Sequence, residues 1–169
     1  MFLIEPCCTQ KHLLELRHKL GGNGACFFHG HGDLSLAEIL PVLLTRYSEV
    51  ELMMVLPRVP DAAAEVIRHV MDREWTTANG KGKVFNIKRL DLIADMRKAK
   101  SPTASAWVKE NPWEGRLFIR NIQQGDTAIL LPDIGMTGPI NLQYGGHFIA
   151  LATRSAKTSA SLKAEYEKL

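Results

Sequence analysis

The sequence predicts a single α/β domain in which helices cover both faces of a mixed β-sheet. In the first half, short apolar runs alternate with amphipathic segments, an order typical of parallel strands joined by crossover helices. The second half contains short strands and a polar C-terminal helix, which makes the sheet mixed. The 169 residues suit one domain, and 46% hydrophobic and 23% charged residues are typical of a globular chain rather than a disordered one.

In the first half, apolar periodicity separates helices from strands, and glycine or proline marks the turns between them. The expected elements are a helix over 9–19, a strand over 25–28, a helix over 33–46, a strand over 50–56, a helix over 61–75, a loop at 79–82, a strand over 83–87 and a short helix over 91–98. Residues 1–23 are expected to be a helical extension of the same domain, which itself spans 24–169.

In the second half, the pattern changes to shorter elements separated by polar and proline-rich segments. The expected elements are a long loop over 99–113 with room for one helical turn, strands over 116–122 and 127–131 joined as a hairpin, an irregular segment over 132–144, a strand over 147–152 and a helix over 156–169. Long loops in compact domains are often functional, so the segment 99–113 is of interest.

The net charge of +3 is small, but the basic residues are concentrated in one segment. Residues 68–120 contain 12 of the 21 Lys and Arg residues and 6 of the 18 Asp and Glu residues. This asymmetry fits a surface that faces a polyanion such as nucleic acid. An ordinary solvated surface explains it equally well, so charge alone leaves both interpretations open.

The three cysteines, Cys7, Cys8 and Cys26, do not form a disulfide framework, because their number is odd and two of them are adjacent. Reduced thiols in a cytoplasmic protein are expected. The N-terminus lacks the pattern of a secretory leader, and no apolar run approaches the roughly 20 residues of a membrane-spanning helix. We therefore expect a cytoplasmic protein without a membrane partner.

A histidine-rich segment is the first candidate for chemistry. His29, His31 and Asp33 alternate after a predicted strand, and alternate strand residues project to one side, as metal-dependent hydrolases require of their His-x-His ligands. The later histidines, His69 and His147, follow in no ligand-like spacing. A metal-dependent hydrolase that uses the first three residues is therefore kept as an alternative, and no metal or cofactor is expected.

Other catalytic motifs are incomplete in this sequence. It contains no Gly-x-Ser-x-Gly, no P-loop and no full Gly-x-Gly-x-x-Gly. Cys26 lies in a predicted buried strand, where a thiol is usually inert. Trp107 and Trp113 flank the predicted loop, where they either stack on nucleic-acid bases or pack the loop onto the domain.

One longer pattern carries a resemblance to a known family. Residues 114–121 (EGRLFIRN) form a strand, residues 127–131 (TAILL) follow after a predicted hairpin, and Asn141 comes next. This order resembles the core of the phospholipase D-like superfamily, which has His-x-Lys-x-x-x-x-Asp on one strand, a hairpin, an apolar strand ending in Gly-Ser, and a nearby Asn. The resemblance covers residues 24–169. It implies one phospholipase D-like half, a unit that allows pairing as a homodimer.

The catalytic residues of that family are missing at the matching positions. Glu114 stands at the histidine position, Arg116 at the lysine position, Asn121 at the aspartate position, and Pro132-Asp133 at the Gly-Ser position. The histidine is the nucleophile of the family, and no His-x-Lys occurs anywhere in the chain. The resemblance therefore implies the scaffold without the catalyst.

A guanidinium can still bind phosphate, because its fork of N–H donors matches two phosphate oxygens. The resemblance thus implies a phosphate-binding site of Arg116, Arg120, Asn121 and Asn141, with Arg116 and Asn121 directed toward Asn141. The predicted function is a non-catalytic domain that binds a phosphate-bearing partner such as nucleic acid through this site and the basic face of 68–120. A structural or protein-interaction domain is the second interpretation, and the metal-dependent hydrolase is the third.

Overall fold

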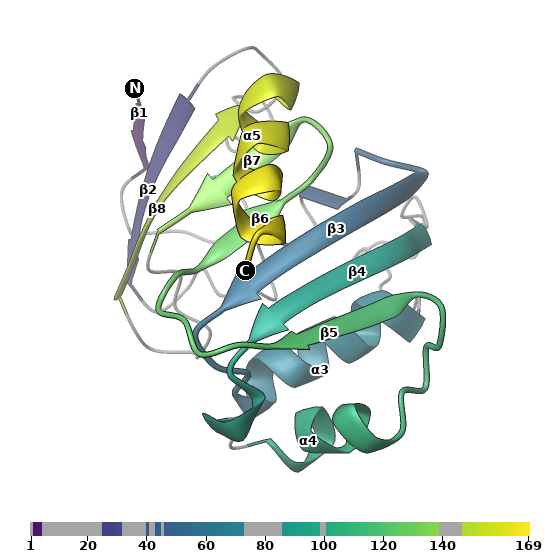
Figure 1. Ribbon diagram of the computed structural model, residues 1–169. Coiled ribbons are helices and arrows are strands. Elements are labelled where there is room, and N and C mark those ends of the chain that lie inside the picture. The colour runs from purple at the N-terminus through teal and green to yellow at the C-terminus, as the bar shows by residue number, and fades with distance from the viewer. Residues whose placement is uncertain are drawn as a thin grey trace, which may run out of the picture.

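The computed structural model describes residues 2–4, 25–31, 40, 43–44, 46–72, 86–98, 101–138 and 147–169. These residues form one mixed sheet of eight strands with helices on both faces (Figure 1). The α/β class and the mixed sheet are therefore confirmed.

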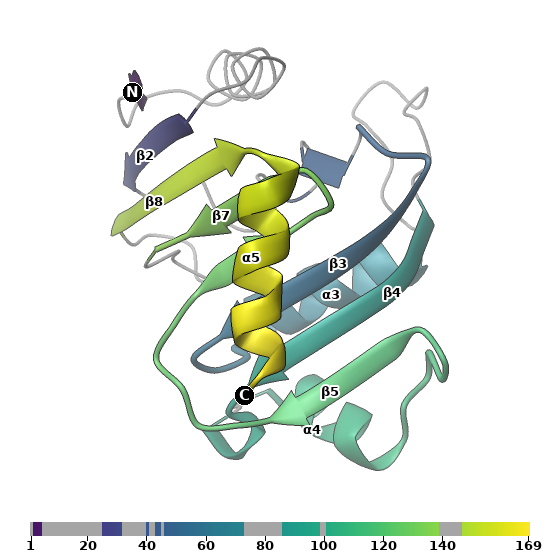
Figure 2. The same ribbon diagram turned by 45° about the horizontal axis from the view of Figure 1, so that its top comes forward.

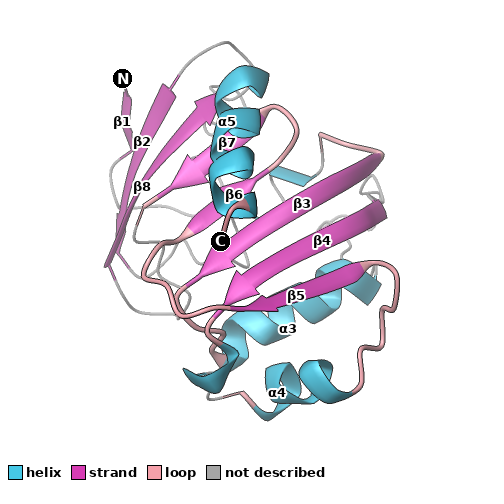
Figure 3. Cartoon of the chain, viewed as in Figure 1, coloured by secondary structure: helices cyan, strands magenta, loops and turns pink. Residues whose placement is uncertain are grey.

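The strands are β1 (Phe2–Ile4), β2 (Ala25–His31), β3 (Glu49–Leu56), β4 (Asn86–Ala94), β5 (Leu117–Asn121), β6 (Ala128–Leu130), β7 (Ile134–Thr137) and β8 (His147–Arg154). The helices are α3 (Asp61–Asp72), the short 3₁₀ helix η1 (Met96–Lys98), α4 (Pro102–Lys109) and α5 (Ala156–Glu167). Figure 3 shows the helices and strands of the fold in separate colours.

The strand order across the sheet is β1-β2-β8-β7-β6-β3-β4-β5. β3, β4 and β5 run parallel to one another. On the other side of β3, the neighbouring pairs β3–β6, β6–β7, β7–β8 and β8–β2 are all antiparallel. The carboxyl ends of β2, β3, β4, β5 and β7 therefore lie at the same end of the sheet. Open α/β sheets commonly bind ligands at this end of their parallel strands.

Helices α3 and α4 cover one face of the sheet and α5 covers the other, as the two views in Figure 1 and Figure 2 show. Alternate residues of each strand face the two layers, so each face has its own core. The larger core lies on the side of α3 and includes its buried residues Ala64, Val66, Ile67, Val70 and Met71, as the sequence predicts. The smaller core packs against α5 and contains Met53, Val55, Ile93, Ala128 and Leu130, with Leu162 and Tyr166 from the helix.

Several predicted elements are confirmed. The strands over 25–28, 50–56 and 147–152 are present and belong to β2, β3 and β8. The helix from residue 61 is present to Asp72, and α5 occupies most of 156–169. The helix over 9–19, the loop at 79–82 and Cys7 and Cys8 lie outside the described residues, and the boundary at residue 23 stays a prediction. A strand at 2–4, paired parallel with β2, was not expected.

The prediction of a short helix over 91–98 was wrong for its first half. β4 continues to Ala94, and only Met96–Lys98 is helical. The strand continues because β4 lies between β3 and β5 and buries Leu90, Leu92 and Ile93 on both of its faces.

The prediction of a loop over 99–113 with at most one helical turn was also wrong, because the eight-residue helix α4 occupies its centre. Ser101 begins this helix, and its Oγ accepts a hydrogen bond from the Ala104 backbone N–H at 3.2 Å. Pro102 takes the first helical turn, where its missing N–H costs nothing. The Ser-Pro pair is thus a helix start, although proline was interpreted as a loop residue in this segment.

The predicted hairpin between 116–122 and 127–131 does not form. β5 pairs parallel with β4 at the edge of the sheet, whereas β6 pairs antiparallel with β3. The hairpin of this region is β6–β7, closed by the Leu131 N–H bond to the Ile134 carbonyl at 2.8 Å, so 134–137 is a strand and not irregular. This topology removes the paired-strand arrangement on which the correspondence of 114–121 to the family motif depended.

Candidate functional site

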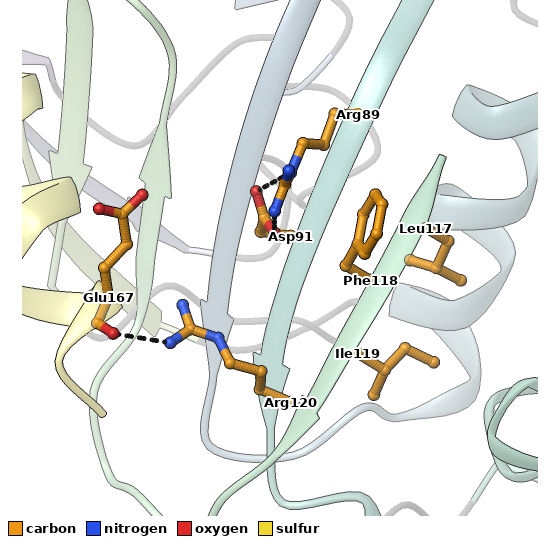
Figure 4. Close-up of a pocket in the computed structure, with 7 residues that line it drawn as sticks. All are labelled: Arg89, Asp91, Leu117, Phe118, Ile119, Arg120 and Glu167. Carbon is orange, nitrogen blue, oxygen red and sulfur yellow. Dashed lines mark hydrogen bonds and ion pairs between the residues drawn. The ribbon is translucent and has the colours of Figure 1, made fainter. Parts of the chain in front are cut away.

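An open pocket of about 610 Å³ lies on the α5 face of the sheet, between strands β4 and β5 and the C-terminal end of α5 (Figure 4). It combines two arginines, two acidic residues and an aromatic ring. Its lining residues are Arg89, Asp91, Leu117, Phe118, Ile119, Arg120 and Glu167.

Strand register explains why these side chains meet. β4 and β5 are parallel, with Asp91 opposite Phe118 and Ile93 opposite Arg120. Arg89 and Asp91 are two residues apart on β4, as are Phe118 and Arg120 on β5, so each pair projects to one face. β5 has no neighbour on its outer side within the described sheet, and the pocket is therefore open along that edge.

Arg89 is held in place by an acid and an aromatic ring. Its Nε and Nη2 donate to the two carboxylate oxygens of Asp91, both at 2.8 Å. These hydrogen bonds raise the pKa of Arg89 above its ordinary value. Its guanidinium carbon lies 4.3 Å from the centroid of the Phe118 ring, a cation–π contact, and Phe118 remains 40% exposed.

Arg120 contacts the end of α5 rather than an acid. Its Nη1 donates to the main-chain carbonyl of Glu167 at 3.2 Å, and Figure 4 shows the Glu167 carboxylate turned away from this contact. A cation at a helix C-terminus is favourable because of the exposed carbonyls there. The Glu167 carbonyl carries no net charge, whereas the carboxylate of Asp91 cancels the positive charge of Arg89. Arg120 is thus the arginine of this pocket whose hydrogen-bonded partner does not cancel its charge.

Arg116 lies elsewhere, although it precedes Arg120 by only four positions. Its Nε donates to the carbonyl of Ile87 at 3.0 Å, and its Nη2 donates to the carbonyl of Met71 at 3.1 Å. Met71 belongs to α3, on the opposite face from α5. The structure therefore does not bring the two predicted phosphate-binding arginines together, and Arg116 joins α3 to β4.

The two predicted asparagines have different outcomes. Asn121, at the end of β5, accepts a hydrogen bond at its Oδ1 from the Met96 backbone N–H at 3.0 Å, which holds the chain as it leaves β4. Asn141 lies outside the described residues, so its proximity to Asn121 stays a prediction. Asp133, at the predicted Gly-Ser position, binds Tyr47 and Arg154 instead.

The basic segment does not form one continuous face. Arg68 lies on α3 and Arg120 contacts α5, which cover opposite faces of the sheet. Several of its cations also pair with acids. These pairs are Arg68 with Glu65 at 3.1 Å, Lys88 with Glu49 at 2.6 Å, Arg89 with Asp91 at 2.8 Å and Arg97 with Asp95 at 3.1 Å. The prediction of a single basic face over 68–120 was wrong, because the segment passes through both layers.

The aromatic residue of the site is one that the sequence analysis missed. Trp107 and Trp113 are 5% and 8% exposed and form a T-shaped pair with centroids 5.4 Å apart, so they pack the domain. The exposed ring is Phe118. The available signal was the alternation Arg116, Phe118, Arg120, which is unusual for an edge strand because it exposes a large apolar side chain.

His29 and His31, the metal candidates, lie on β2, and Asp33 lies outside the described residues. No helix in the described part of the chain is long and apolar enough to cross a membrane.

Comparison with known proteins supports the fold. Neither a protein-family model nor a curated protein sequence matches the chain. Solved structures do match: NucT from Helicobacter pylori is 13% identical with a TM-score of 0.54, over 87% of this chain and 95% of NucT. The polyphosphate kinase from Porphyromonas gingivalis is 14% identical with a TM-score of 0.60, over 98% of this chain and 29% of the kinase. The archaeal chromatin protein TrmBL2, described with a novel mode of DNA binding, is 13% identical with a TM-score of 0.50, over 94% of this chain and 58% of TrmBL2.

These structural similarities identify the type of fold. The chain has a phospholipase D-like fold, as the sequence resemblance implied. It corresponds to nearly the whole of NucT, but to about a third of the polyphosphate kinase and somewhat more than half of TrmBL2. At 13–14% identity these similarities describe the fold alone.

Proposed function

We propose that this chain is a non-catalytic phospholipase D-like domain that binds a phosphate-bearing partner, namely nucleic acid, at the pocket of Arg89, Phe118 and Arg120. The observation that carries the proposal is the position of Arg120 beside a partly exposed aromatic ring at an open sheet edge. The proposal includes a cytoplasmic protein that forms a homodimer.

Arg120 has the chemistry of a phosphate ligand. One of its five N–H donors is used on a neutral carbonyl, which leaves the others for an anion. A guanidinium binds two phosphate oxygens at once, and a phosphodiester carries the negative charge that Arg120 lacks in this pocket. Arg116 and Asn121 are hydrogen-bonded to the main chain and are not part of this pocket, and a contribution from Asn141 stays a prediction.

Phe118 supplies what a charge alone does not. Bases of single-stranded nucleic acid stack on exposed aromatic rings beside positively charged groups, with little dependence on sequence. Arg89 covers part of the ring at 4.3 Å, and the exposed remainder faces solvent. The DNA binding named for TrmBL2, which shares this fold, is consistent with the same class of partner.

The absence of catalysis in this proposal rests on the sequence. No His-x-Lys occurs in the chain, so the nucleophile and the lysine of the family motif have no counterpart. Neither 114–121 nor the β6–β7 hairpin carries a histidine. The domain would therefore hold a phosphodiester without cleaving it.

The test is fluorescence anisotropy with a labelled single strand and a labelled duplex of equal length, measured across a salt series. Affinity should fall as salt rises, because bound cations displace counterions from phosphate. Arg120→Ala should weaken binding and reduce the slope of log affinity against log salt by about 1. Lys109→Ala, which removes an exposed cation from α4 on the other face, is the matched control and should leave binding unchanged.

Two results would overturn the proposal. The first is no binding of either probe by folded protein at low salt, which would favour the protein-interaction interpretation. The second is an equal loss of affinity in Arg120→Ala and Lys109→Ala, which would indicate attraction by net charge without a site. Arg120→Lys should keep the charge but lose part of the affinity, because an ammonium lacks the two-pronged geometry.

A further inference from the structure

A buried acid lies in the pocket to which we assign an anionic ligand. Asp91 on β4 is 8% exposed and lines the pocket together with Arg89, Phe118 and Arg120. A carboxylate repels a phosphate that comes close to it, so Asp91 lowers the affinity of the pocket for a polyanion unless it has another role there. The contacts of Asp91 indicate what that role is.

Asp91 fixes the guanidinium of Arg89. Its two carboxylate oxygens accept hydrogen bonds from Nε and Nη2 of Arg89, both at 2.8 Å, which is the two-pronged geometry of an arginine–carboxylate pair. The two side chains meet because they stand two residues apart on β4 and project to the same face. Since Asp91 also cancels the charge of Arg89, a phosphate gains less from Arg89 than from Arg120.

Phe118 supports the same guanidinium from one side. The guanidinium carbon of Arg89 lies over the Phe118 ring, 4.3 Å from its centroid (Figure 4). Phe118 stands opposite Asp91 in the register of β4 and β5, so strand pairing brings the three side chains together. The side chain of Arg89 stays 47% exposed, and Phe118 is 40% exposed. Unpaired nucleobases stack on aromatic rings and on the planes of arginine guanidinium groups, and this pocket presents both to solvent.

We propose that Arg89 is a base-stacking residue and that Asp91 positions it, which makes the pocket specific for the unpaired bases of single-stranded nucleic acid. This inference rests on the proposed nucleic-acid binding at Arg120. Arg120 holds a phosphate, and the pair of Arg89 and Phe118 holds a base of the same strand. The bases of a duplex are already stacked and paired, so a duplex contacts Arg120 alone. Cancelling the charge of Arg89 removes a second phosphate contact that would attract single strands and duplexes alike.

The first test uses the full chain and three labelled DNA probes of equal length: a single strand, a duplex, and a single strand without bases. Wild type should bind the normal single strand at least about fivefold more tightly than the abasic strand, which has the same phosphates but no base to stack. Arg89→Lys keeps the positive charge and loses the guanidinium plane. It should lower the affinity for the normal single strand by about the same factor and leave the affinity for the abasic strand unchanged.

Asp91→Asn separates positioning from packing. The amide has nearly the size of the carboxylate, but it neither cancels the charge of Arg89 nor accepts from both of its donors. Duplex affinity should rise, and its slope against salt on logarithmic axes should steepen by about 1, because Arg89 can then bind a phosphate. The ratio of single-strand to duplex affinity should fall at least about fivefold. A purely structural Asp91 would leave this ratio unchanged, because misfolding reduces the binding of both probes equally.

Lys88 and Glu49 provide a matched control pair. They form an ion pair at 2.6 Å between β4 and β3 and do not line the pocket. Lys88→Ala and Glu49→Gln should change the affinity for all three probes by the same factor and leave the affinity ratios at the wild-type values. Far-UV circular dichroism confirms that each variant is folded.

Two results would overturn this inference while leaving phosphate binding at Arg120 intact. The first is equal affinity of wild type for the normal and the abasic single strand. The second is an Arg89→Lys variant that binds the normal single strand as tightly as wild type does. In both cases Arg120→Ala still weakens the binding of every probe. If folded wild-type protein binds none of the three probes at low salt, the proposed function fails, and the inference fails with it.

Discussion

The guanidinium of Arg116 donates from Nη2 to the main-chain carbonyl of Met71 in the last turn of α3, at 3.1 Å. The same side chain donates from Nε to the carbonyl of Ile87 in β4, at 3.0 Å. The carbonyls at a helix C-terminus have no partner within the helix, and a cation satisfies both their hydrogen bonding and their partial charge. Arg116 therefore stabilises the docking of α3 on the sheet.

Arg116→Ala should lower the free energy of unfolding by about 2–3 kcal/mol. Each of its two hydrogen bonds contributes at the low end of the roughly 1.5–3 kcal/mol of a bond to a charged group, because Arg116 is partly exposed. Urea unfolding followed by circular dichroism measures the change. Lys109→Ala should change stability by less than about 0.5 kcal/mol, as is usual for surface positions. Equal stability of Arg116→Ala and wild type would contradict the structural role.

Trp113→Phe should lower the free energy of unfolding by about 1–2 kcal/mol. The substitution removes the hydrogen bond from Trp113 Nε1 to Asp72 Oδ1, which measures 2.6 Å, and keeps an aromatic ring beside Trp107. Trp113→Ala should lower the free energy of unfolding further, by about 3–5 kcal/mol, because it also leaves a cavity. In a double-mutant cycle with Asp72→Ala the two effects should be less than additive, and full additivity would show that the bond contributes nothing.

Phe118→Ala should weaken binding of a single strand by about 1–3 kcal/mol, the usual contribution of one base–aromatic stack. Its effect on the duplex should be smaller, because paired bases are not available for stacking. Val108→Ala is the control, since Val108 is an exposed apolar residue on α4, away from the pocket. Equal losses for single strand and duplex would argue against stacking on Phe118.

Tyr47 should make stability sensitive to alkaline pH. Burial, followed by its hydrogen bond to Asp133, raises the pKa of Tyr47 above the ordinary value of about 10. In the unfolded chain this hydroxyl loses its proton near pH 10, whereas in the folded chain it keeps it. The stabilisation is therefore fully present below about pH 10 and is lost progressively as the pH rises above it.

The measurement compares wild type with Tyr47→Phe by urea unfolding at pH 8 and pH 11. The phenylalanine variant should be less stable at pH 8, because Asp133 loses a hydrogen-bond donor and retains Arg154. The difference in unfolding free energy between wild type and Tyr47→Phe should be smaller at pH 11, by up to about 1.4 kcal/mol for each pH unit above 10. A difference that does not change with pH would show that Tyr47 does not titrate in this way.

The local elements of the fold were largely predictable from the sequence. The helix from Asp61 was identified because its apolar residues recur at helical spacing, which depends on few neighbours. The N-cap role of Ser101 was missed, although the Ser-Pro signal was present. β4 was predicted too short, because residues 91–98 were predicted to be a helix. The pairing of Asp91 with Arg89 follows only from the strand that carries both residues.

The candidate site was predicted only in part. Arg120, which lines the pocket, was among the predicted site residues, but Arg116 was assigned to the same site because it stands at the lysine position of the resembled family motif. Gly115 explains the difference, since its φ of 76° turns the chain just before Arg116 and ends the alternation that holds within β5. Phe118 completes the pocket through its register with Asp91, which belongs to another strand.

The sequence by itself determined the α/β class, most of the helices and strands, and the lack of a His-x-Lys pair, because these depend on composition and local periodicity. Only the tertiary structure decided that β5 pairs with β4 instead of β6, that Arg116 and Arg120 contact opposite layers, and that His147 lies opposite His31. Strand pairing is set by burial of apolar faces over long distances in the chain, and no local pattern encodes which strand becomes the neighbour.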